Sequence, residues 1–514
     1  MASRAFTRLM ASYSHTSFMN HTNTVQIVLF VALGSLTYGY CASIIATTLA
    51  QPSFIAYFSL ATRSDAAALS GAINGLFQAG GLVGALSCGP VADWLGRKKA
   101  LAIGAALAAI GGGLQAGSVN IAMYIVMRFI TGLGIGALVT LVPLYQSEIA
   151  PPQIRGLLVG MHGVLICVGY ALASWVGVGF YFVNASGAQW RIPLAIQCLP
   201  PLTLAFGVLF LPESPRWLLS KDRIEAAFDS FKITRDDSVA ADEGIIRAQF
   251  EVLHRQLLHE KENAVSYADM FRLPHYRKRC IIGFLTMFGA QGTATLVINN
   301  FGPLLYSQLS FGTVQQLLIQ AGWISVCPIG NFINALVVDR LGRTRMLMFG
   351  FAGCIVALIG ECATVAQYNK TQSRSVAAAA VFYLFLHIAC FSSAVDATSY
   401  IYASEIFPTP VRAKGLSISV SGLFVATIIF LQVAPTAFES IGWRYYLLFI
   451  AITSVLFVVI WVWFPETRQQ NLEDIGTLYG DDVSLFDEKI RAAQMGATGH
   501  ESDKEARTRE VEDL

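Results

Sequence analysis

The stretch DWLGRK at residues 93–98 recurs as DRLGR at residues 339–343, and this repeat decides the fold of the chain. Three more signatures recur in the same order about 250 residues apart: SEIAP at 147–151 and SEIFP at 404–408, WR at 190–191 and 443–444, and PESPR at 212–216 and PETR at 465–468. Four ordered pairs at nearly one spacing indicate an internal duplication. Duplicated membrane halves are how many transporters form a central site that opens to either side. The repeat therefore predicts a carrier.

The composition excludes a single soluble domain. Hydrophobic residues make up 54% of the 514 residues and charged residues 13%, well below the roughly 25% charged residues usual in soluble domains. Mean hydropathy is +0.55. The net charge of +2 indicates no nucleic-acid partner. The expected surroundings of the chain are a lipid bilayer.

Twelve apolar stretches have about the 20 residues needed to cross the hydrocarbon core as a helix. They centre near residues 36, 79, 108, 133, 170, 201, 293, 327, 355, 390, 427 and 453. We predict an all-α membrane protein with twelve transmembrane helices in two six-helix halves. The expected units are an N-terminal segment (1–25), the first half (26–212), a helical segment between the halves (213–279), the second half (280–464) and a charged tail (465–514).

Basic residues in the short loops set the expected orientation. The loops at 97–99 and 340–345 are rich in Arg and Lys, so these loops, both termini and the central segment are expected to be cytoplasmic. The opposite loops hold two sequons, at Asn184 and Asn369, which are candidate glycosylation sites. The plasma membrane is the expected location.

Catalytic chemistry has no support in the sequence. No nucleophile–base set is evident, and the nine cysteines have no metal-ligand spacing. Gly132, Gly134 and Gly136 lie inside an apolar span, where close helix packing is the expected role. We therefore expect no enzyme activity, no cofactor and no metal.

At its signatures the chain resembles the sugar porter family of the major facilitator superfamily, in particular fungal sugar transporters. The resemblance covers about residues 25–470, and it implies the major facilitator fold and transport by alternating access. In relatives, the charged signature residues form cytoplasmic networks that hold the outward-facing state and break on switching. The matching residues here are Asp93, Arg97, Glu148, Arg155, Glu213, Arg216, Asp339, Arg343, Glu405 and Arg412. The alternative is that these charges only set the topology.

The substrate positions depart from the family pattern. Where hexose carriers place hydrogen-bonding side chains, this chain has Gly163, Leu296 and Leu423, and only Gln291 keeps its type. Each lost hydrogen bond is worth roughly 0.5–1.5 kcal/mol. Other groups would have to replace them, or the substrate is less polar or differently shaped. The candidate substrate-binding residues are Gln291, Asn299, Asn300, Asp396 and Tyr400.

Two charged residues, Arg128 and Asp396, fall within predicted spans. In proton-coupled relatives, an aspartate in the first span pairs with the arginine, but Cys41 occupies that position here. Arg128 must then pair elsewhere or lie near the cytoplasmic interface, because a buried arginine without a partner is costly. Asp396 has two interpretations: a substrate or proton site, and a buried counter-ion or polar group at a helix break. His162 and His387 are expected to be packing residues.

The predicted function is secondary transport of a small organic solute by alternating access, with sugars and polyols first through the resemblance. The alternative within transport is a non-sugar organic acid or specialised metabolite. A non-transporting nutrient receptor is the alternative from another class. The expected partners are the solute and the bilayer, and coupling to protons is left open.

Overall fold

The computed structural model of the chain describes residues 22–150, 155–183, 185, 187–234, 243–262, 265–408, 411–468 and 478–479. Within these residues no strand is present, and twelve helices are long and apolar enough to cross a membrane. Six of the twelve precede residue 211 and six follow residue 273. The prediction of two six-helix halves is therefore confirmed.

The N-terminal half begins with a first span made of two consecutive helices. Its helices are α3 (Thr22–Val31) and α4 (Leu33–Leu49), α6 (Ala66–Leu95), α7 (Arg97–Ala116), α8 (Ile121–Ile149), α9 (Arg155–Tyr181), and α10 (Ala188–Ile196) followed by α11 (Leu199–Gly207) and η2 (Val208–Phe210). The short α5 (Pro52–Tyr57) and η1 (Leu60–Thr62) connect the first two spans.

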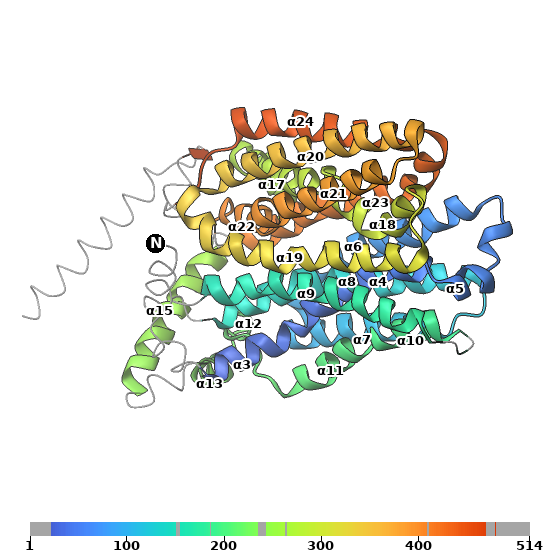
Figure 1. The fold of residues 1–514 in the computed structure, drawn as a ribbon. Coiled ribbons are helices and arrows are strands. Elements are labelled where there is room, and N and C mark those ends of the chain that lie inside the picture. The colour runs from blue at the N-terminus through green and yellow to red at the C-terminus, as the bar shows by residue number, and fades with distance from the viewer. Residues whose placement is uncertain are drawn as a thin grey trace, which may run out of the picture.

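The C-terminal half contains two spans that are interrupted near their middle. Its helices are α17 (Pro274–Gly292) and α18 (Thr295–Gln308), α19 (Thr313–Leu341), α20 (Arg343–Thr371), α21 (Arg374–Ala394) and α22 (Asp396–Glu405), α23 (Arg412–Ser440), η4 (Gly442–Arg444) and α24 (Tyr445–Trp463). In Figure 1 the blue-to-green N-terminal half lies below the yellow-to-red C-terminal half, with the helix axes nearly horizontal.

The described part of the segment between the halves contains four helices: α12 (Pro215–Ser220), α13 (Ile224–Ile233), α15 (Glu243–Glu262) and α16 (Tyr267–Arg272). Leu218, Phe231 and Phe250 from three of them share a small apolar cluster. Helix α17 begins at Pro274, earlier than the predicted boundary at residue 280. The connecting helices lie at the left of Figure 1, at the end of the bundle that carries the two DxLGR-type loops. We call this the signature end.

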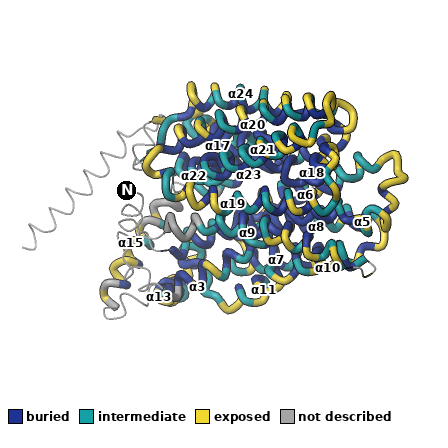
Figure 2. The backbone as a smooth tube through the Cα atoms, in the orientation of Figure 1, coloured by how far each residue is buried: buried dark blue, intermediate teal, exposed yellow. Residues whose placement is uncertain are grey.

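The outer helices expose apolar side chains that only a lipid environment can solvate favourably. Phe210 is 89% exposed, Phe349 79% and Trp461 70%. Figure 2 shows exposed segments along the outer helices α24 and α11 and buried segments between the halves. A soluble protein rarely exposes so much contiguous apolar surface. The chain is a multi-pass membrane protein.

Glycines bring several helices into close contact. A Cβ added at Gly132 of α8 would lie 2.0 Å from the carbonyl oxygen of Phe77, and one added at Gly136 would lie 1.9 Å from that of Gly81. A Cβ added at Gly134 would lie 2.5 Å from the backbone nitrogen of Ala108 in α7. The packing role predicted for these three glycines is confirmed.

Helix α6 of the first half and helix α23 of the second form a long seam between the halves. A Cβ at Gly71 would meet the backbone of Gln432 at 2.2 Å, and one at Gly81 would meet the ring of Phe424 at 2.3 Å. Nearer the signature end, Ser417 Oγ donates a hydrogen bond of 3.1 Å to the carbonyl oxygen of Ala85. The two halves therefore touch at both ends of this helix pair.

The structure describes one of the two asparagines predicted as glycosylation sites. Asn369 is exposed near the C-terminus of α20, at the end of the bundle away from the signature loops. Asn184 lies outside the described residues. Glycosylation at either position stays a prediction.

Candidate functional site

At the signature end of the N-terminal half, Arg97 joins three helix ends. Its guanidinium lies 3.1 Å from Glu148 Oε1 and 3.0 Å from Asp93 Oδ1. The side chains of Arg97 and Glu148 are only 12% and 9% exposed. An ion pair with so little exposure is weakly screened, so it holds the ends of α6, α7 and α8 together.

The C-terminal half repeats this arrangement with Arg343. Its guanidinium lies 2.8 Å from both Glu405 Oε1 and Asp339 Oδ1. Glu405 is more exposed than its counterpart, at 27%, and its other oxygen accepts a 2.8 Å hydrogen bond from Thr467 Oγ1. In the second copy, a hydroxyl group therefore also binds the carboxylate of the ion pair.

A second carboxylate caps the following helix in each half. Glu213 accepts hydrogen bonds from the backbone N–H groups of Arg97 (3.1 Å) and Lys98 (3.2 Å) at the start of α7. Glu466 accepts them from Arg343 (2.8 Å) and Thr344 (3.2 Å) at the start of α20. A carboxylate at a helix N-terminus satisfies free N–H groups and complements the helix dipole.

The turn before each capped helix requires glycine. Gly96 and Gly342 both have φ +97°, a conformation that side-chain-bearing residues rarely adopt. A Cβ at these positions would also lie 2.4 Å from Glu213 and 2.6 Å from Glu466. The glycine of the DxLGR-type signature therefore makes room for the capping carboxylate.

The two capping carboxylates differ in their pKa. Burial raises the pKa of Glu213 above its usual value, and the three backbone N–H groups only partly offset this. Burial also acts to raise the pKa of Glu466, but hydrogen bonds from Thr344 and from neighbouring backbone N–H groups outweigh it, so that pKa is lowered. The Thr344 hydroxyl donates to Glu466 Oε2 at 2.6 Å, and a lysine occupies that position in the first copy.

The ion pairs of Arg97 and Arg343 each join helices of one half. Arg412, predicted for the same network, donates from Nε to the carbonyl oxygen of Phe407 (3.4 Å). Arg216 takes part in further contacts of its own, and the side chain of Arg155 is outside the described part of the structure. A gating role for these charges stays a prediction.

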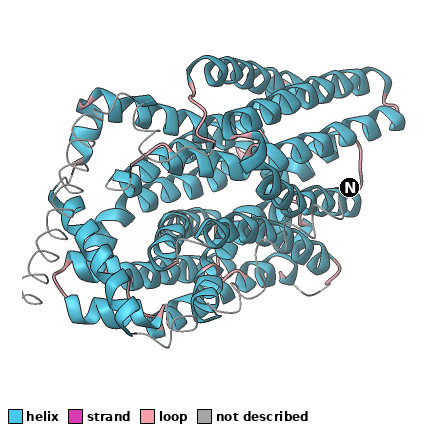
Figure 3. Cartoon of the chain, turned by 90° about the vertical axis from the view of Figure 1, so that its left-hand side faces the viewer, coloured by secondary structure: helices cyan, strands magenta, loops and turns pink. Residues whose placement is uncertain are grey.

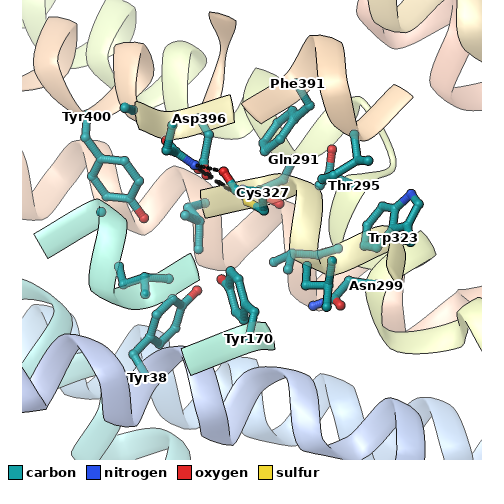
Figure 4. A pocket seen from close by; sticks show the side chains of 18 residues that line it. Tyr38, Tyr170, Gln291, Thr295, Asn299, Trp323, Cys327, Phe391, Asp396 and Tyr400 are labelled. Carbon is teal, nitrogen blue, oxygen red and sulfur yellow. Dashed lines mark hydrogen bonds between the residues drawn. The ribbon is translucent and has the colours of Figure 1, made fainter. Parts of the chain in front are cut away.

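A cavity lies between the halves at mid-depth. Its volume is about 40 Å³, enough for a few water molecules but not for a sugar ring. The lining residues are Tyr38, Gly163, Ile166, Tyr170, Gln291, Thr295, Leu296, Asn299, Trp323, Ile324, Cys327, Asn331, Ile388, Phe391, Asp396, Ala397, Tyr400 and Leu423. Figure 4 shows Asp396 beside Cys327, with Tyr38 and Tyr170 facing them from the other half.

Four of the five predicted substrate residues line this cavity: Gln291, Asn299, Asp396 and Tyr400. Asn300 is not among the lining residues, because it is one position further along α18 and its amide donates to the carbonyl oxygen of Leu296 (2.9 Å). The prediction missed several lining residues that are polar or aromatic, namely Tyr38, Tyr170, Thr295, Trp323 and Asn331. A polar residue inside an apolar span, such as Asn331, was the available signal.

The seventh span is interrupted beside the cavity. Ala294 has φ 71°, a left-handed conformation that is costly for a residue other than glycine. The break frees two backbone carbonyl groups, and side chains from other helices satisfy them. His387 Nε2 bonds the carbonyl oxygen of Thr293 at 2.8 Å, and Thr453 Oγ1 donates to that of Gly292 at 3.1 Å. His387 therefore has the packing role predicted for it.

The tenth span breaks at Val395, directly before Asp396, which is the first residue of α22. Asp396 Oδ2 accepts a hydrogen bond from Asn331 Nδ2 at 2.8 Å and lies 3.6 Å from Cys167 Sγ and 3.7 Å from Cys327 Sγ. Irregular backbone inside a membrane is tolerated where it lines a cavity. Both interpretations of Asp396 thus fit its position, since it lies at a helix break and in the cavity.

Arg128 is fully buried, and carbonyl groups take the place of the aspartate that Cys41 replaces. Its Nη1 donates to the backbone carbonyl oxygen of Cys41 at 3.0 Å and its Nε to that of Ile73 at 3.4 Å. The guanidinium also lies 4.1 Å from the centre of the Phe77 ring. It belongs to the part of α8 away from the signature end, so of the two alternatives for Arg128 its contacts support pairing elsewhere.

On the side of the cavity opposite the signature end, two hydrogen bonds between side chains join the halves. Ser43 Oγ donates to Asn299 Oδ1 at 3.3 Å, and Trp175 Nε1 donates to Ser325 Oγ at 3.0 Å. Each bond joins one half to the other. Toward the signature end, the lining residue Tyr400 is only half-buried.

Comparison with known proteins agrees with this architecture. The family described as "Sugar (and other) transporter" matches residues 27–479. The chain is 33% identical to the MFS-type transporter criB of Aspergillus cristatus, over 91% of this chain and 95% of that protein. It is 28% identical to a probable quinate permease of Aspergillus clavatus (88% of each) and 27% identical to a high-affinity glucose transporter of Kluyveromyces lactis (91% and 87%).

Solved structures share the fold. The proton:xylose symporter XylE bound to 6-bromo-6-deoxy-D-glucose superposes with a TM-score of 0.74 at 22% identity, covering 90% of this chain and all of that one. A partially occluded inward-open form of XylE from E. coli gives 0.72 at 22% identity, covering 88% and 100%. With its two six-helix halves, its duplicated signatures and the family match over most of its length, the chain belongs to the sugar transporter family of the major facilitator superfamily.

Proposed function

We propose that the protein is a secondary transporter that carries a small neutral organic solute, a sugar or polyol in the first place, by alternating access of its two halves. The observation that carries the proposal is the cavity between the halves. Its lining comes from α4 and α9 of one half and from α19, α23 and the two broken spans of the other. Broken helices that meet at mid-depth between repeats are where transporters place their substrate sites.

The charge of the cavity argues for a neutral solute. Asp396 lines it, and its lining contains no lysine, arginine or histidine. An anionic solute would meet a carboxylate without a compensating cation at low dielectric, which is unfavourable. A sugar, a polyol or a neutral metabolite fits these groups better than an organic acid does.

A neutral metabolite less polar than a hexose is the second candidate. Gly163, Leu296 and Leu423, which replace the hydrogen-bonding groups of hexose carriers, all line the cavity. Trp323 and Phe391 add apolar ring surface, which suits a flat or partly apolar ring. A solute with fewer hydroxyl groups than a hexose would lose less on leaving water.

We also propose that the signature end faces the cytoplasm. We further propose that the cavity is closed on the opposite side, as in an inward-facing state. Contacts between the halves on the other side of the cavity, including Ser43 with Asn299, support this direction. Epitope tags at both termini should react with antibody only in permeabilised cells. Reaction in intact cells would contradict the orientation. The plasma membrane is the proposed location, and fractionation of cells expressing the tagged chain tests it.

Transport itself is tested in proteoliposomes. The purified chain should take up at least one radiolabelled solute from a panel of hexoses, pentoses, polyols, neutral ring metabolites and organic acids, and unlabelled solute inside should accelerate uptake. A preference for an organic acid would overturn the electrostatic argument. Binding of a solute without transport would instead favour a nutrient receptor.

A further inference from the structure

Two cysteines from opposite halves meet the cavity carboxylate. Cys167 of α9 and Cys327 of α19 have their Sγ atoms 3.1 Å apart. Asp396 Oδ2 lies 3.6 Å from the first sulfur and 3.7 Å from the second. The three ligand atoms all lie within 4.8 Å of one another. No sequence pattern indicates this cluster, because its members are far apart in the chain.

We propose that Cys167, Cys327 and Asp396 form a binding site for a thiophilic divalent cation of the zinc class. Zinc binds thiolates at about 2.3 Å and carboxylates at about 2.0–2.2 Å in tetrahedral sites. Those bond lengths place sulfur and oxygen ligands about 3.5 Å apart and two sulfur ligands about 3.8 Å apart. The observed sulfur–oxygen distances already match. The two sulfur atoms, which lie 3.1 Å apart, would have to separate by roughly 0.7 Å.

The surroundings complete such a site. Asn331 Nδ2 donates to the same Asp396 oxygen at 2.8 Å and to Cys167 Sγ at 3.0 Å, so it orients both groups and we assign it as a positioning residue outside the ligand set. Cys327, Asn331 and Asp396 line the cavity. A fourth coordination position is thus left for water or a solute group, as in zinc sites with three protein ligands.

The charge balance favours the ion. Both cysteines are buried, at 1% and 3% exposure, and two thiols with one carboxylate carry a net charge of −1. A divalent cation that displaces both thiol protons to solvent leaves the cluster at −1, since two thiolates and one carboxylate oppose its +2. Binding therefore adds no net buried charge, which would otherwise be costly.

A disulfide between the cysteines is the competing outcome. It would need the sulfur atoms to close to about 2.05 Å, together with an oxidant, and it would give Asp396 and Asn331 no part. The geometry with the carboxylate beside both sulfur atoms favours the ion. Because Cys167 belongs to the first half and the other two ligands to the second, a bound ion would tie the halves together and stop their relative motion.

The test measures binding by the metal alone. The purified full-length chain is reduced, freed of metal and reductant, and titrated with CdCl2 or ZnCl2. We expect one ion per chain by equilibrium dialysis, an ultraviolet cadmium–thiolate charge-transfer band, and a higher thermal unfolding midpoint. Mg²⁺, which prefers oxygen ligands, should have none of these effects.

Variants distinguish this site from other thiols. Cys167→Ser and Cys327→Ser should each remove the band and lower affinity by at least ~100-fold, and Asn331→Ala should lower it by ~10–100-fold. Cys88→Ser is the matched control, because Cys88 is also a buried free cysteine of a span but does not line the cavity. It should bind as the unmodified chain does.

Two results would overturn the proposal. One is the absence of a bound ion in the reduced chain, or binding that survives both cysteine substitutions. The other is a chain that binds no metal, but whose halves, cut at a protease site inserted between residues 234 and 243, stay linked until a reductant is added. That result would identify a disulfide instead. Because binding is measured without solute, failure here is distinct from failure of the transport proposal.

Discussion

The signature end and the central cavity differ in how far the two halves resemble each other. At the signature end the contacts are duplicated: Arg97 pairs with Glu148 as Arg343 pairs with Glu405. In the cavity, the first half contributes mainly aromatic and apolar groups, whereas the second contributes the amides, the carboxylate and both broken spans. Each half needs ion pairs that hold its helix ends together, but one solute needs only one set of polar partners. We therefore expect the duplicated region to serve the movement and the asymmetric region to serve recognition.

The largest expected effect lies in the asymmetric region. Asp396→Asn removes the cavity's carboxylate but keeps its shape. If Asp396 carries a proton, pH-driven accumulation should fall to background while downhill exchange of the same solute persists. If Asp396 binds the solute, both should fall together. Both activities are measured in proteoliposomes in buffer with a chelator, so that the site stays free of metal.

Glu361→Gln is the control for this prediction. Glu361 is also a buried carboxylate, 2% exposed, but it does not line the cavity. Its substitution should leave the pH dependence of accumulation in place. Unchanged accumulation, exchange and pH dependence in Asp396→Asn would remove the residue from the site and indicate a facilitator.

The next effect tests whether the duplicated networks are equivalent. Arg97→Ala leaves Glu148, only 9% exposed, without its cation, and it should cost about 3 kcal/mol of stability. Arg343→Ala should cost less, about 1–2 kcal/mol, because Thr467 still donates to Glu405. Thermal unfolding midpoints of the purified variants measure the difference. Equal losses would show that the extra hydrogen bond of the second copy contributes nothing.

A third test concerns the glycines of the two signature turns. Gly96→Ala and Gly342→Ala should each destabilise the protein by about 1–3 kcal/mol, because both positions have φ +97° and no room for a Cβ. Gly179→Ala is the control, since nothing lies within 4 Å of a Cβ there. It should be neutral or slightly stabilising. A similar loss in all three variants would argue against the turn geometry as the cause.

The smallest effect separates the two capping carboxylates. Both oxygens of Glu466 accept hydrogen bonds, so Glu466→Gln places an amide N–H against a donor and should cost about 1–2 kcal/mol. Because the pKa of Glu466 is lowered in the fold, its stabilising effect is present above the ordinary glutamate pKa of about 4.3. It is lost as pH falls through the lower folded pKa.

The contribution of Glu213 to stability should depend on pH in the opposite sense, and Glu213→Gln tests this. The raised pKa of Glu213 means that its stabilising effect is present at low pH and is lost as pH rises through the folded value. Its Oε1 alone can accept the bonds from Arg97, Lys98 and Ser214, and a glutamine keeps that oxygen. We therefore expect little change near neutral pH in unfolding midpoints. A loss as large as that of Glu466→Gln would contradict the difference between the halves.

The sequence predicted the parts of the structure that depend on local pattern. Hydropathy located twelve spans, and the repeated charges located the network at one end of the bundle. A helix break at Asp396 was one of the two interpretations of that residue, but the break at Ala294 was not located. The carbonyl groups freed beside Ala294 are satisfied by the distant residues His387 and Thr453, and no pattern in one sequence reveals those contacts.

The candidate site was predicted in the same uneven way. Gln291 was named because it keeps the residue type of the resembled family, and Asp396 because it is a charged residue within a span; both line the cavity. Asn300 does not line it, because the register of a broken helix cannot be read from spacing. The carbonyl partners of Arg128 were also invisible, since backbone groups carry no sequence signal. The meeting of Cys167 with Cys327 depends on how two halves dock, which hydropathy does not encode.

The glycine-lined seam between α6 and α23 has a mechanical consequence. At Gly71 and Gly81 the partner helix fills the space that a side chain would occupy, so the two helices cannot approach further there. In a rocking motion that keeps this seam closed, the seam is the pivot. The cavity then widens or narrows as the angle between the halves changes. A bulky residue at either glycine would act as a wedge, fixing the angle between the halves without touching the solute.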